Sequence, residues 1–443
     1  MENIFSSKLH GFSINSKDHL TLNAIDLVEI AHLSDRPIYV FNELGVRENI
    51  RAYCQSLELF YPKPSSLFYA SKAFFNLAMG SLLCQEGVGV DVCSEGELYI
   101  ALKANIPPSR IIMHGNNKSA KELRFAVKSN VNCIIVDNKD ELFLLDKICS
   151  ELKIPCNILL RINPDVQVST HKYIDTGTKE SKFGFYTDRG KIPEYLDAIK
   201  ENNYIFFKGI HCHIGSNIID VSNYIKAIDI VTDYLSFLNK KGIKTEVLNM
   251  GGGLGIPYQE GDSPLDIRSF TKTICQSITE ACKNKNLELP HLMLEPGRSI
   301  VGSAGCTLYT IGSIKEGPER ILYAAVNGGM SDNIRPSLYQ ATHTAIIANK
   351  MNWSGETHYY KIVGKCCESG DVLINNIRLP MCASGDVLVV FSTGAYNHSL
   401  ANNYNKHQIP GVIFIRNEEY DWVSKEQSLE DLTKQDLLPV HLT

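Results

Sequence analysis

The sequence lacks a long apolar run, a long basic run and any CxxC pair, and each absence argues against a class of protein. No apolar stretch approaches the roughly 20 residues of a membrane-spanning helix, so we expect no membrane segment. The net charge of −5, from 44 basic and 49 acidic residues, disfavours nucleic acid and anionic membranes as partners. Without a CxxC pair nothing indicates a zinc site or a redox dithiol, and we expect no metal.

A secretory signal is also missing. The first residues, Met1–Lys8, show no basic region followed by an apolar one. The 13 cysteines are scattered and odd in number, which is typical of free thiols rather than of a disulfide framework. We therefore expect a protein of the reducing cytoplasm.

Length and strand pattern predict two domains. The 443 residues exceed one typical core. From residue 37 to about 303, apolar strands alternate with helical stretches, and eight such strands predict a (β/α)8 TIM-like barrel. Residues 304–443 show strand-like runs without helices between them, which predicts an antiparallel β-barrel or sandwich domain. Residues 1–36 should add a strand and a helix to that β domain, and Lys425–Asp436 should form a surface helix.

One predicted barrel strand ends on a lone amine. Leu67–Ala70 form an apolar run, and Lys72 follows just before a helix-like segment. An amine at the mouth of a strand, shielded by apolar neighbours, has a lowered pKa and can attack a carbonyl. The alternative is that Lys72 merely begins the helix and extends to water, as most lysines do.

Polar residues follow other predicted strands, at the barrel end where this fold places its chemistry. They are Asp91, His114, Asp137, Arg161, His213 and Glu295–Arg298. The glycine run in Met250–Gly255 also follows a strand, and its bare backbone could approach an anion or simply form a tight turn.

A phosphate cup is one interpretation of that glycine run. It could be completed by Gly297, Arg298, Ser216 and Tyr396. A lysine and a phosphate cup without a nucleotide motif together suggest pyridoxal phosphate.

Six short motifs occur in an order that resembles the diaminopimelate decarboxylases, from about residue 36 to 440. They are Tyr69–Ala73, His211–Ser216, Gly251–Gly253, Glu295–Arg298, Ile334–Tyr339 and Cys367–Asp371. That family belongs to the pyridoxal-phosphate decarboxylases with an alanine-racemase-like barrel. The resemblance implies decarboxylation of meso-2,6-diaminopimelate to L-lysine and carbon dioxide, the last step of lysine biosynthesis.

The resemblance also implies which barrel residues hold the cofactor. Lys72 would be the Schiff-base lysine, and His213 would stack on the pyridine ring; otherwise a lone histidine is more often a core residue. Asp91 and Arg161 would orient groups near the ring and His213, although a structural role is nearly as compatible with them. The phosphate region would be held by Gly252, Gly253, Gly297, Arg298, Ser216 and Tyr396.

Glu295 is the residue most informative about the reaction. A carboxylate that faces the pyridine nitrogen keeps this nitrogen protonated, so the ring can take the electron pair left behind when carbon dioxide departs. An arginine in its place would suit the related racemases. Glutamate at residue 295 therefore favours decarboxylation.

By the same resemblance, the protein is a homodimer whose subunits share the active site. Arg335 and Tyr339 would bind the distal carboxylate of the substrate, together with Arg298. Tyr396 would also contact the substrate. The neighbouring subunit would supply Cys367 as the acid that reprotonates the substrate carbon.

The same neighbouring loop would supply Glu368, which would receive the distal ammonium of the substrate. Lys182 would pair with Asp371 across the interface. Cys366 adjoins Cys367, so which thiol faces the site stays open.

Two other functions are compatible with parts of this pattern. A paralogue could act on another amino acid, such as ornithine or lysine, and would then not need Arg335. A non-catalytic pyridoxal-phosphate carrier or a silent homologue would lack the β domain or site residues, which this sequence has. The segment Asp165–Glu180 is either a lid over the cofactor or an ordinary surface loop.

Overall fold

The computed structural model describes residues 11–166, 181–185, 189–199, 203–259 and 261–442, and these divide into two compact units. The barrel unit comprises residues 47–256 and 263–300, and the β unit comprises residues 1–46, 257–262 and 301–443. Among the described residues, no helix has the length and apolar character needed to cross a membrane.

Eight parallel strands close the barrel, as the sequence predicted. In chain order they are β5 (Ser65–Ala70), β6 (Gly89–Val92), β7 (Ile111–Met113), β8 (Cys133–Val136), β9 (Cys156–Arg161), β10 (Ile205–His211), β11 (Val247–Asn249) and β12 (His291–Leu294). Closure comes from β12 pairing with β5, in the register Leu294 to Leu67. Alternating side chains fill the interior, which is a packed core rather than a pore: Phe68, Ile112, Cys133, Ile135, Leu159, Val247 and Met293.

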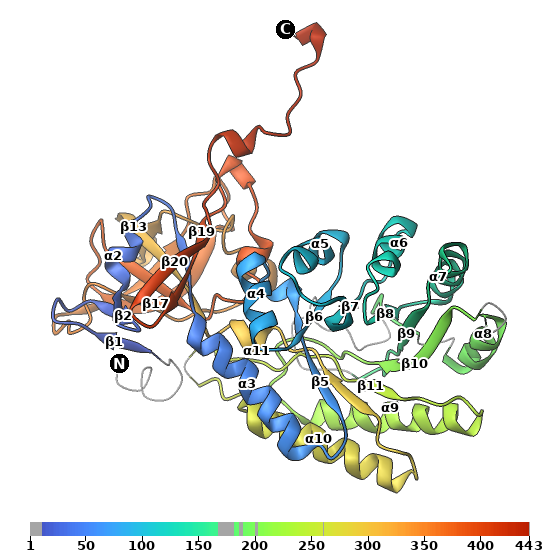
Figure 1. Cartoon of the computed structure of the whole chain (residues 1–443). Coiled ribbons are helices and arrows are strands. Elements are labelled where there is room, and N and C mark those ends of the chain that lie inside the picture. Colours follow the sequence, from blue (N-terminus) through green and yellow to red (C-terminus); the bar gives the residue numbers. More distant parts are fainter. Residues whose placement is uncertain (1–10, 167–180, 186–188, 200–202, 260, 443) are drawn as a thin grey trace. The chain divides into compact units, whose positions relative to one another are not determined.

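Helices connect the strands and surround the barrel (Figure 1). They are α3 (Glu43–Phe60), α4 (Leu77–Gln85), α5 (Glu95–Lys103), α6 (Ala120–Lys128), α7 (Lys139–Leu152), α8 (Ile192–Ile199), α9 (Ser222–Lys240), α10 (Ile267–Asn284) and the short α11 (Arg298–Val301). Polar side chains cap several helix starts by accepting a backbone N–H, each worth about 1 kcal/mol. The caps are Asn76, Ser94, Ser119, Asn138 and Asp266.

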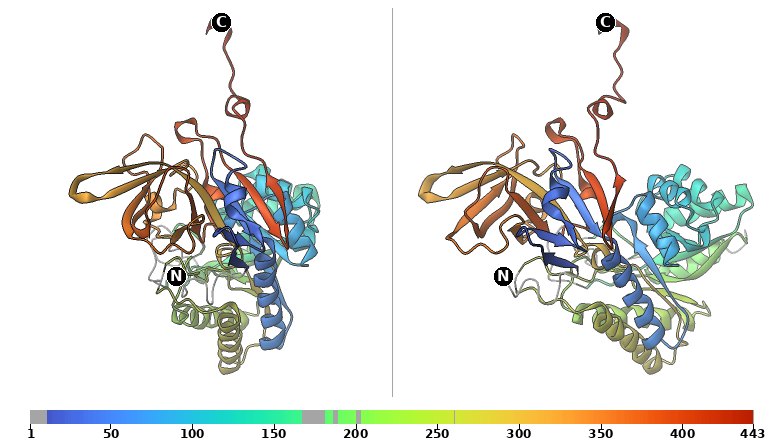
Figure 2. Two further views of the ribbon diagram at one scale, coloured as in Figure 1. Left: turned by 90° about the vertical axis from the view of Figure 1, so that its left-hand side faces the viewer. Right: turned by 60° about the vertical axis from the view of Figure 1, so that its left-hand side comes forward.

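The β unit is built around the long strand β13 (Gly305–Glu316), which pairs with three strands. Its neighbours are β4 (Ile38–Asn42), β14 (Leu322–Val326) and β18 (Val387–Phe391). Figure 2 shows the β13–β14 hairpin projecting from the rest of its sheet. The other strands are β15 (Ala345–Ile347), β16 (Thr357–Val363), β17 (Val372–Pro380), β19 (Gly411–Arg416) and β20 (Glu419–Ser424).

Most pairings in this sheet are antiparallel, but β14 with β16 and β4 with β19 are parallel. The N-terminal segment joins the unit, as expected. It contributes the three-stranded sheet β1 (Phe12–Ile14), β2 (Leu20–Leu22) and β3 (Ile25–Asp26), followed by α2 (Leu27–Ala31). Leu20 and Leu22 are buried in the same apolar cluster as Leu308 and Val389.

The prediction of a surface helix over Lys425–Asp436 is wrong. After β20 the described residues form only short 3₁₀ turns, at Glu430–Leu432 and Val440–Leu442. Most residues here are exposed, and Leu429 keeps 66% of its surface accessible. A short helix without a packed apolar face is marginal in water, which explains the difference.

Candidate active site

Lys72 lies where the sequence placed it, in the 3₁₀ turn Ser71–Ala73 just after β5. The backbone N–H of Ala70 donates to the carbonyl of Pro296 at 3.1 Å, which ties this strand end to the loop after β12. Ser71 and Ala73 are buried but Lys72 is exposed, contrary to the apolar shielding expected. The amine is therefore accessible at the carboxyl-terminal mouth of the barrel.

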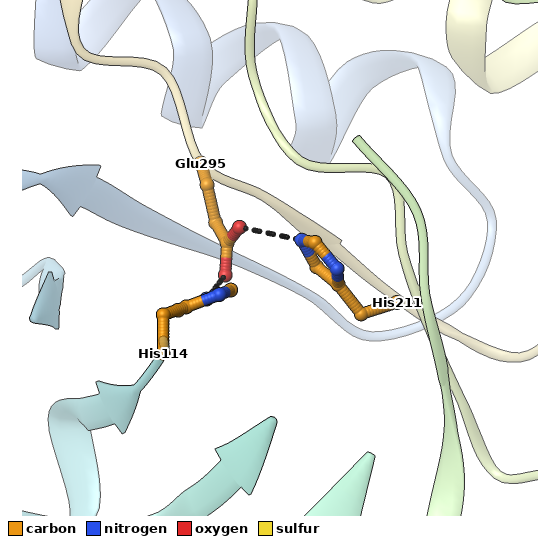
Figure 3. A group of neighbouring side chains, drawn as sticks. All are labelled: His114, His211 and Glu295. Carbon is orange, nitrogen blue, oxygen red and sulfur yellow. Dashed lines mark hydrogen bonds and ion pairs between the residues drawn. The ribbon is translucent and has the colours of Figure 1, made fainter. Parts of the chain in front are cut away.

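Glu295, directly after β12, accepts hydrogen bonds from the side chains of His114 and His211 (Figure 3). Its side chain is 4% exposed. Oε1 accepts from Nε2 of His114 at 2.9 Å and from Nδ2 of Asn249 at 2.7 Å. Oε2 accepts from Nε2 of His211 at 3.1 Å. Three donors thus converge on one buried carboxylate from the ends of β7, β11 and β10.

Asp91 on β6 is buried to the same extent, since each of the two residues is 5% exposed. Burial raises the pKa of Asp91 to about 6, although nearby His114 opposes this shift. Burial also disfavours the charge of Glu295, but His114 and His211 outweigh it and hold the pKa of Glu295 well below its usual value. The barrel mouth thus holds two acids with opposite pKa shifts, a pattern that often marks functional groups.

His213 follows β10 and contacts the glycine turn. Its Nδ1 accepts a hydrogen bond from the N–H of Gly252 at 3.3 Å. Burial, and then the positive charges of Lys72 and Arg161, hold the pKa of His213 well below its usual value, so the ring is neutral at pH 7. A neutral imidazole at this position is compatible with stacking on an aromatic ring.

The glycine turn leaves no room for side chains. A Cβ on Gly252 would lie 2.1 Å from the carbonyl oxygen of Glu295, and one on Gly253 would lie 2.3 Å from that of Gly215. Gly253 also has φ +112°, which disfavours any residue with a Cβ. The N–H groups of Gly251 and Gly252 donate to barrel side chains, so an anion bound by this turn would rely on other N–H groups.

Arg298 and Ser216 form a polar pair beside this turn. Nη2 of the buried Arg298 donates to the Ser216 hydroxyl at 3.0 Å. Gly297 is packed against Ala70 and Ala73, where a Cβ would lie 3.0 and 3.1 Å from their methyl groups. Gly297 therefore lies against the end of β5, and the next residue, Arg298, binds Ser216.

Arg161, the last residue of β9, stacks on the ring of Phe183 with 4.1 Å between guanidinium carbon and ring centre. Burial lowers the pKa of Arg161, and Asp137 opposes this shift. Asp137 accepts the N–H of Gly184 at 3.1 Å. Arg161 is thus fixed at the barrel mouth. Of the segment Asp165–Glu180 that the sequence suggested as a lid, residues 167–180 lie outside the described residues.

The proposed substrate residues Arg335 and Tyr339 begin and end α12 (Arg335–Tyr339) in the β unit. Arg335 is 4% exposed, and its guanidinium carbon lies 4.5 Å from the centre of the Tyr258 ring. Tyr396 has φ +61°, a conformation rare for an aromatic residue and often found at functional sites.

Cys366 and Cys367 differ in accessibility. Cys366 is buried, and burial raises the pKa of its thiol. Cys367 is exposed, and its N–H donates to Oδ1 of Asn405 at 2.7 Å. Beside it, Glu368 accepts the Tyr404 hydroxyl at 3.4 Å. Of the two thiols, Cys367 is therefore the one available to a substrate.

Sequence reasoning missed the roles of His211 and Asn249. A signal was present for His211, because residues two apart on a strand share a face, and His213 was already a candidate. Asn249 ends a strand just before the glycine run, but amides at strand ends are common and gave no distinct signal. Their joint contact with Glu295 depends on the pairing of β10, β11 and β12.

His114, His211 and Glu295 could in principle hold a metal, since one ligand atom from each lies within 4.8 Å of the others. However, the amide nitrogen of Asn249 donates to the same carboxylate, and an amide N–H is not a metal ligand. The arrangement fits a carboxylate held by protein hydrogen-bond donors better than a metal chelate.

Comparison with known proteins shows which family has this barrel. The family model described as "Pyridoxal-dependent decarboxylase, pyridoxal binding domain" matches residues 46–302. A diaminopimelate decarboxylase of Bacillus subtilis (strain 168) is 43% identical over 439 residues, covering 97% of this chain and 98% of that protein. The chain belongs to the diaminopimelate decarboxylase family.

Other members of the family support this assignment. A diaminopimelate decarboxylase of Staphylococcus aureus (strain COL) is 40% identical, covering 95% of this chain and 98% of that protein. The crystal structure of the Methanocaldococcus jannaschii enzyme in complex with L-lysine has a TM-score of 0.92 and 34% identity, covering 98% and 100% of the two chains.

The residues present fit the pyridoxal phosphate that the family uses. An accessible lysine, a neutral imidazole and a buried carboxylate all lie at one end of the barrel. The glycine turn excludes side chains and could admit a phosphate, with Ser216 and Arg298 as further donors.

Proposed function

We propose that this chain removes one carboxylate of meso-2,6-diaminopimelate as carbon dioxide and so forms L-lysine, the last step of lysine biosynthesis. The observation that carries the proposal is Glu295: a buried carboxylate held ionised by three donors at the mouth of a pyridoxal-binding barrel. The relatives compared above are named diaminopimelate decarboxylases, and the one from Bacillus subtilis is 43% identical over 97% of this chain.

The barrel unit would bind the cofactor. When bound, pyridoxal phosphate supplies a ring that accepts the electron pair left as the Cα–carboxylate bond breaks. Lys72 would attach the cofactor covalently, and His213 would pack against its ring. Glu295 would accept a hydrogen bond from the ring nitrogen and so keep it protonated. Asp91 and Arg161 support these groups from neighbouring strands.

The phosphate would be held by residues that lie near the glycine turn and by one residue of the β unit. Ser216 and Arg298 offer a hydroxyl and a guanidinium, and the turn would offer backbone N–H groups other than those of Gly251 and Gly252. The set is Gly252, Gly253, Gly297, Ser216, Arg298 and Tyr396.

Most of the residues that would select the substrate belong to the β unit. Arg335, Tyr339 and Arg298 would bind the distal carboxylate, because a guanidinium can donate two parallel hydrogen bonds to it. Tyr396 would also contact the substrate. In the homodimer we propose, Cys367 and Glu368 enter the site of the neighbouring subunit. Glu368 receives the distal ammonium.

Cys367 then supplies the proton that replaces the lost carboxylate on the substrate carbon. Its exposure, against the burial of Cys366, supports this assignment. We place the enzyme in the cytoplasm because all 13 cysteines are free, as expected in a reducing compartment.

The decisive experiment measures carbon dioxide release from the cofactor-loaded protein. The substrates are meso-diaminopimelate, its LL isomer, L-ornithine, L-lysine and L-arginine, tested in parallel. Turnover of the meso compound alone is the expected result. Release from ornithine or lysine instead would contradict the proposal and favour a paralogue with another substrate.

A further inference from the structure

We propose that His114, His211 and Asn249 are positioning residues that hold Glu295 as an oriented, ionised acceptor for the pyridine nitrogen of the cofactor. This rests on the role proposed above for Glu295 and adds three residues that set the protonation of the ring without touching the substrate. Figure 3 shows the two imidazoles approaching the carboxylate from different sides.

Asn249 can only donate to Glu295. Its Oδ1 accepts the N–H of Gly251 at 2.9 Å, which fixes the orientation of the amide. The Nδ2 end therefore faces Oε1 of Glu295, 2.7 Å away. Asn249 is fully buried, so no water competes for this donor. The N–H of Glu295 in turn donates to the carbonyl of Gly251 at 2.7 Å, which locks the two strand ends together.

His211 donates a hydrogen bond to Glu295, and this contact determines its tautomer. Its Nε2 lies 3.1 Å from Oε2, and an ionised carboxylate only accepts, so the hydrogen is on Nε2. Among the described residues Nδ1 has no hydrogen-bond partner. Burial lowers the pKa of His211 to about 4, although Glu295 opposes this shift, so the ring stays neutral at pH 7. The contact is therefore a hydrogen bond rather than an ion pair.

His114 lies between the two buried acids. Its Nε2 is 2.9 Å from Oε1 of Glu295 and 3.8 Å from Oδ1 of Asp91, so it donates to Glu295. Its ring meets that of His211 edge to face, with centroids 4.8 Å apart, which restricts rotation of both rings. Other charged groups also act on this cluster: Lys72 and Glu97 act on Asp91, Arg161 acts on His211, and Asp137 acts on His114.

The effect of the three donors on the pKa of Glu295 can be judged by comparison with Asp91. It is as buried as Glu295, but its contacts are long: Sγ of Cys93 at 3.7 Å and Nε2 of His114 at 3.8 Å. Burial raises the pKa of this acid to about 6, while that of Glu295 is lowered. What distinguishes the two sites is the set of short donors, so these donors and not burial keep Glu295 charged.

The remaining acceptor capacity of Glu295 lies on Oε2. A carboxylate offers about four lone-pair positions. The described residues use two on Oε1 and one on Oε2. One lone pair on Oε2 is left, and we assign it to the N–H of the pyridine ring.

The test measures the protonation of the ring nitrogen directly, by 15N NMR of holoenzyme loaded with 15N-labelled pyridoxal phosphate and free of substrate. The wild-type nitrogen should be protonated from about pH 6 to 9. His211→Leu and His114→Leu remove a donor and should lower the titration midpoint by about one pH unit or more, a tenfold change in proton affinity. His211→Gln and His114→Gln keep an amide N–H and should shift it less.

His291→Leu is the matched control. This histidine lies at the other end of β12, where its Nε2 contacts the Ser66 hydroxyl at 2.8 Å, and its loss should leave the midpoint unchanged. Leucine variants that titrate within about 0.3 pH unit of the wild type would overturn the proposal. A neutral ring nitrogen in the wild type would instead overturn the role of Glu295 itself, so the two failures are distinguishable.

A second measurement needs no variant. The 15N shifts of the histidine side chains in wild-type holoenzyme should show His211 as the neutral Nε2–H tautomer at pH 7, and His114 with a hydrogen on Nε2. An Nδ1–H tautomer or a doubly protonated ring at His211 contradicts the proposal. So does stoichiometric zinc bound through these nitrogens.

Discussion

Asp371 accepts a hydrogen bond from the backbone N–H of Met330 at 2.6 Å and so joins the two loops of the β unit that carry the proposed substrate residues. Its second oxygen accepts from the N–H of Cys366 at 2.8 Å. The hydroxyl of Ser337, in α12, donates to the carbonyl of Gly370 at 2.8 Å. The Arg335 helix and the loop of Cys367 and Glu368 are therefore ordered together within one subunit. The pairing of Asp371 with Lys182 across an interface stays a prediction.

Asp371→Asn should loosen both loops. One of the two backbone N–H groups would then face an amide NH₂ instead of an oxygen, which destabilises the buried site by about 1–3 kcal/mol. We expect faster hydrogen exchange at the amides of Met330 and Cys366. Asp436→Asn, at an exposed position, is the control and should change neither. Unaltered exchange in Asp371→Asn would show that this carboxylate does not order the loops.

Lys72→Ala should abolish covalent attachment of the cofactor. The visible absorbance band of the loaded protein is expected to disappear, and kcat to fall by about 10³-fold or more, because the nucleophilic amine is lost. Lys121→Ala is a suitable control, since that side chain is 80% exposed and pairs only at the surface with Glu95. A band that persists in Lys72→Ala would contradict the assignment.

Gly253→Ala should weaken cofactor binding. The new Cβ would lie 2.3 Å from the carbonyl oxygen of Gly215, on a residue with φ +112°. Strain of about 1–3 kcal/mol corresponds to a roughly 5- to 150-fold weaker Kd for pyridoxal phosphate, measured by fluorescence titration of the cofactor-free protein. Gly190→Ala, where nothing lies within 4 Å of the added Cβ, should bind like the wild type. Equal affinity of the two variants would contradict a phosphate-binding turn.

His211 and Asp91 should affect stability with opposite dependence on pH. The pKa of His211 is lowered to about 4 from 6.5, so its contribution is present above pH 6.5 and is lost as the pH falls towards 4. The pKa of Asp91 is raised to about 6 from 3.8, so its contribution is absent above pH 6 and grows as the pH falls towards 4. Each effect is at most on the order of 3 kcal/mol.

The two effects can be separated by urea unfolding of the cofactor-free chain between pH 4.5 and 7. Asp91→Asn should lose stability more steeply than the wild type as the pH falls, because the loss from His211 is no longer offset. His211→Gln should lose less stability than the wild type over the same range. Parallel profiles for all three proteins would mean that neither group titrates in the folded state as stated.

Arg335→Ala tests the substrate assignment. Loss of a buried guanidinium that binds a carboxylate should raise KM for meso-diaminopimelate by about 30-fold or more, while the absorbance of the bound cofactor stays unchanged. Arg378→Ala, an exposed arginine of the same unit that donates to the Thr357 hydroxyl at 2.7 Å, is the control. Full activity of Arg335→Ala would favour a paralogue acting on a substrate without a distal carboxylate.

Much of the fold could be predicted because strands and helices alternate with regular spacing. The number of barrel strands and the β-rich C-terminal region follow from local patterns of apolar residues, and both are confirmed. The unit to which β4 belongs could not be predicted from these local patterns. Its five residues are all buried and resemble a barrel strand, but β4 pairs with β13 and β19.

For the site, the sequence by itself determined the residues whose type is chemically unusual at a strand end: Lys72, His213, Glu295 and the glycines after Met250. Such residues stand out in the sequence because a polar side chain, or a glycine without a side chain, interrupts a run of apolar strand residues. Only the tertiary structure decided what surrounds Glu295. His114, His211 and Asn249 lie on three strands far apart in sequence, and only the pairing of strands in the closed barrel directs them to one carboxylate.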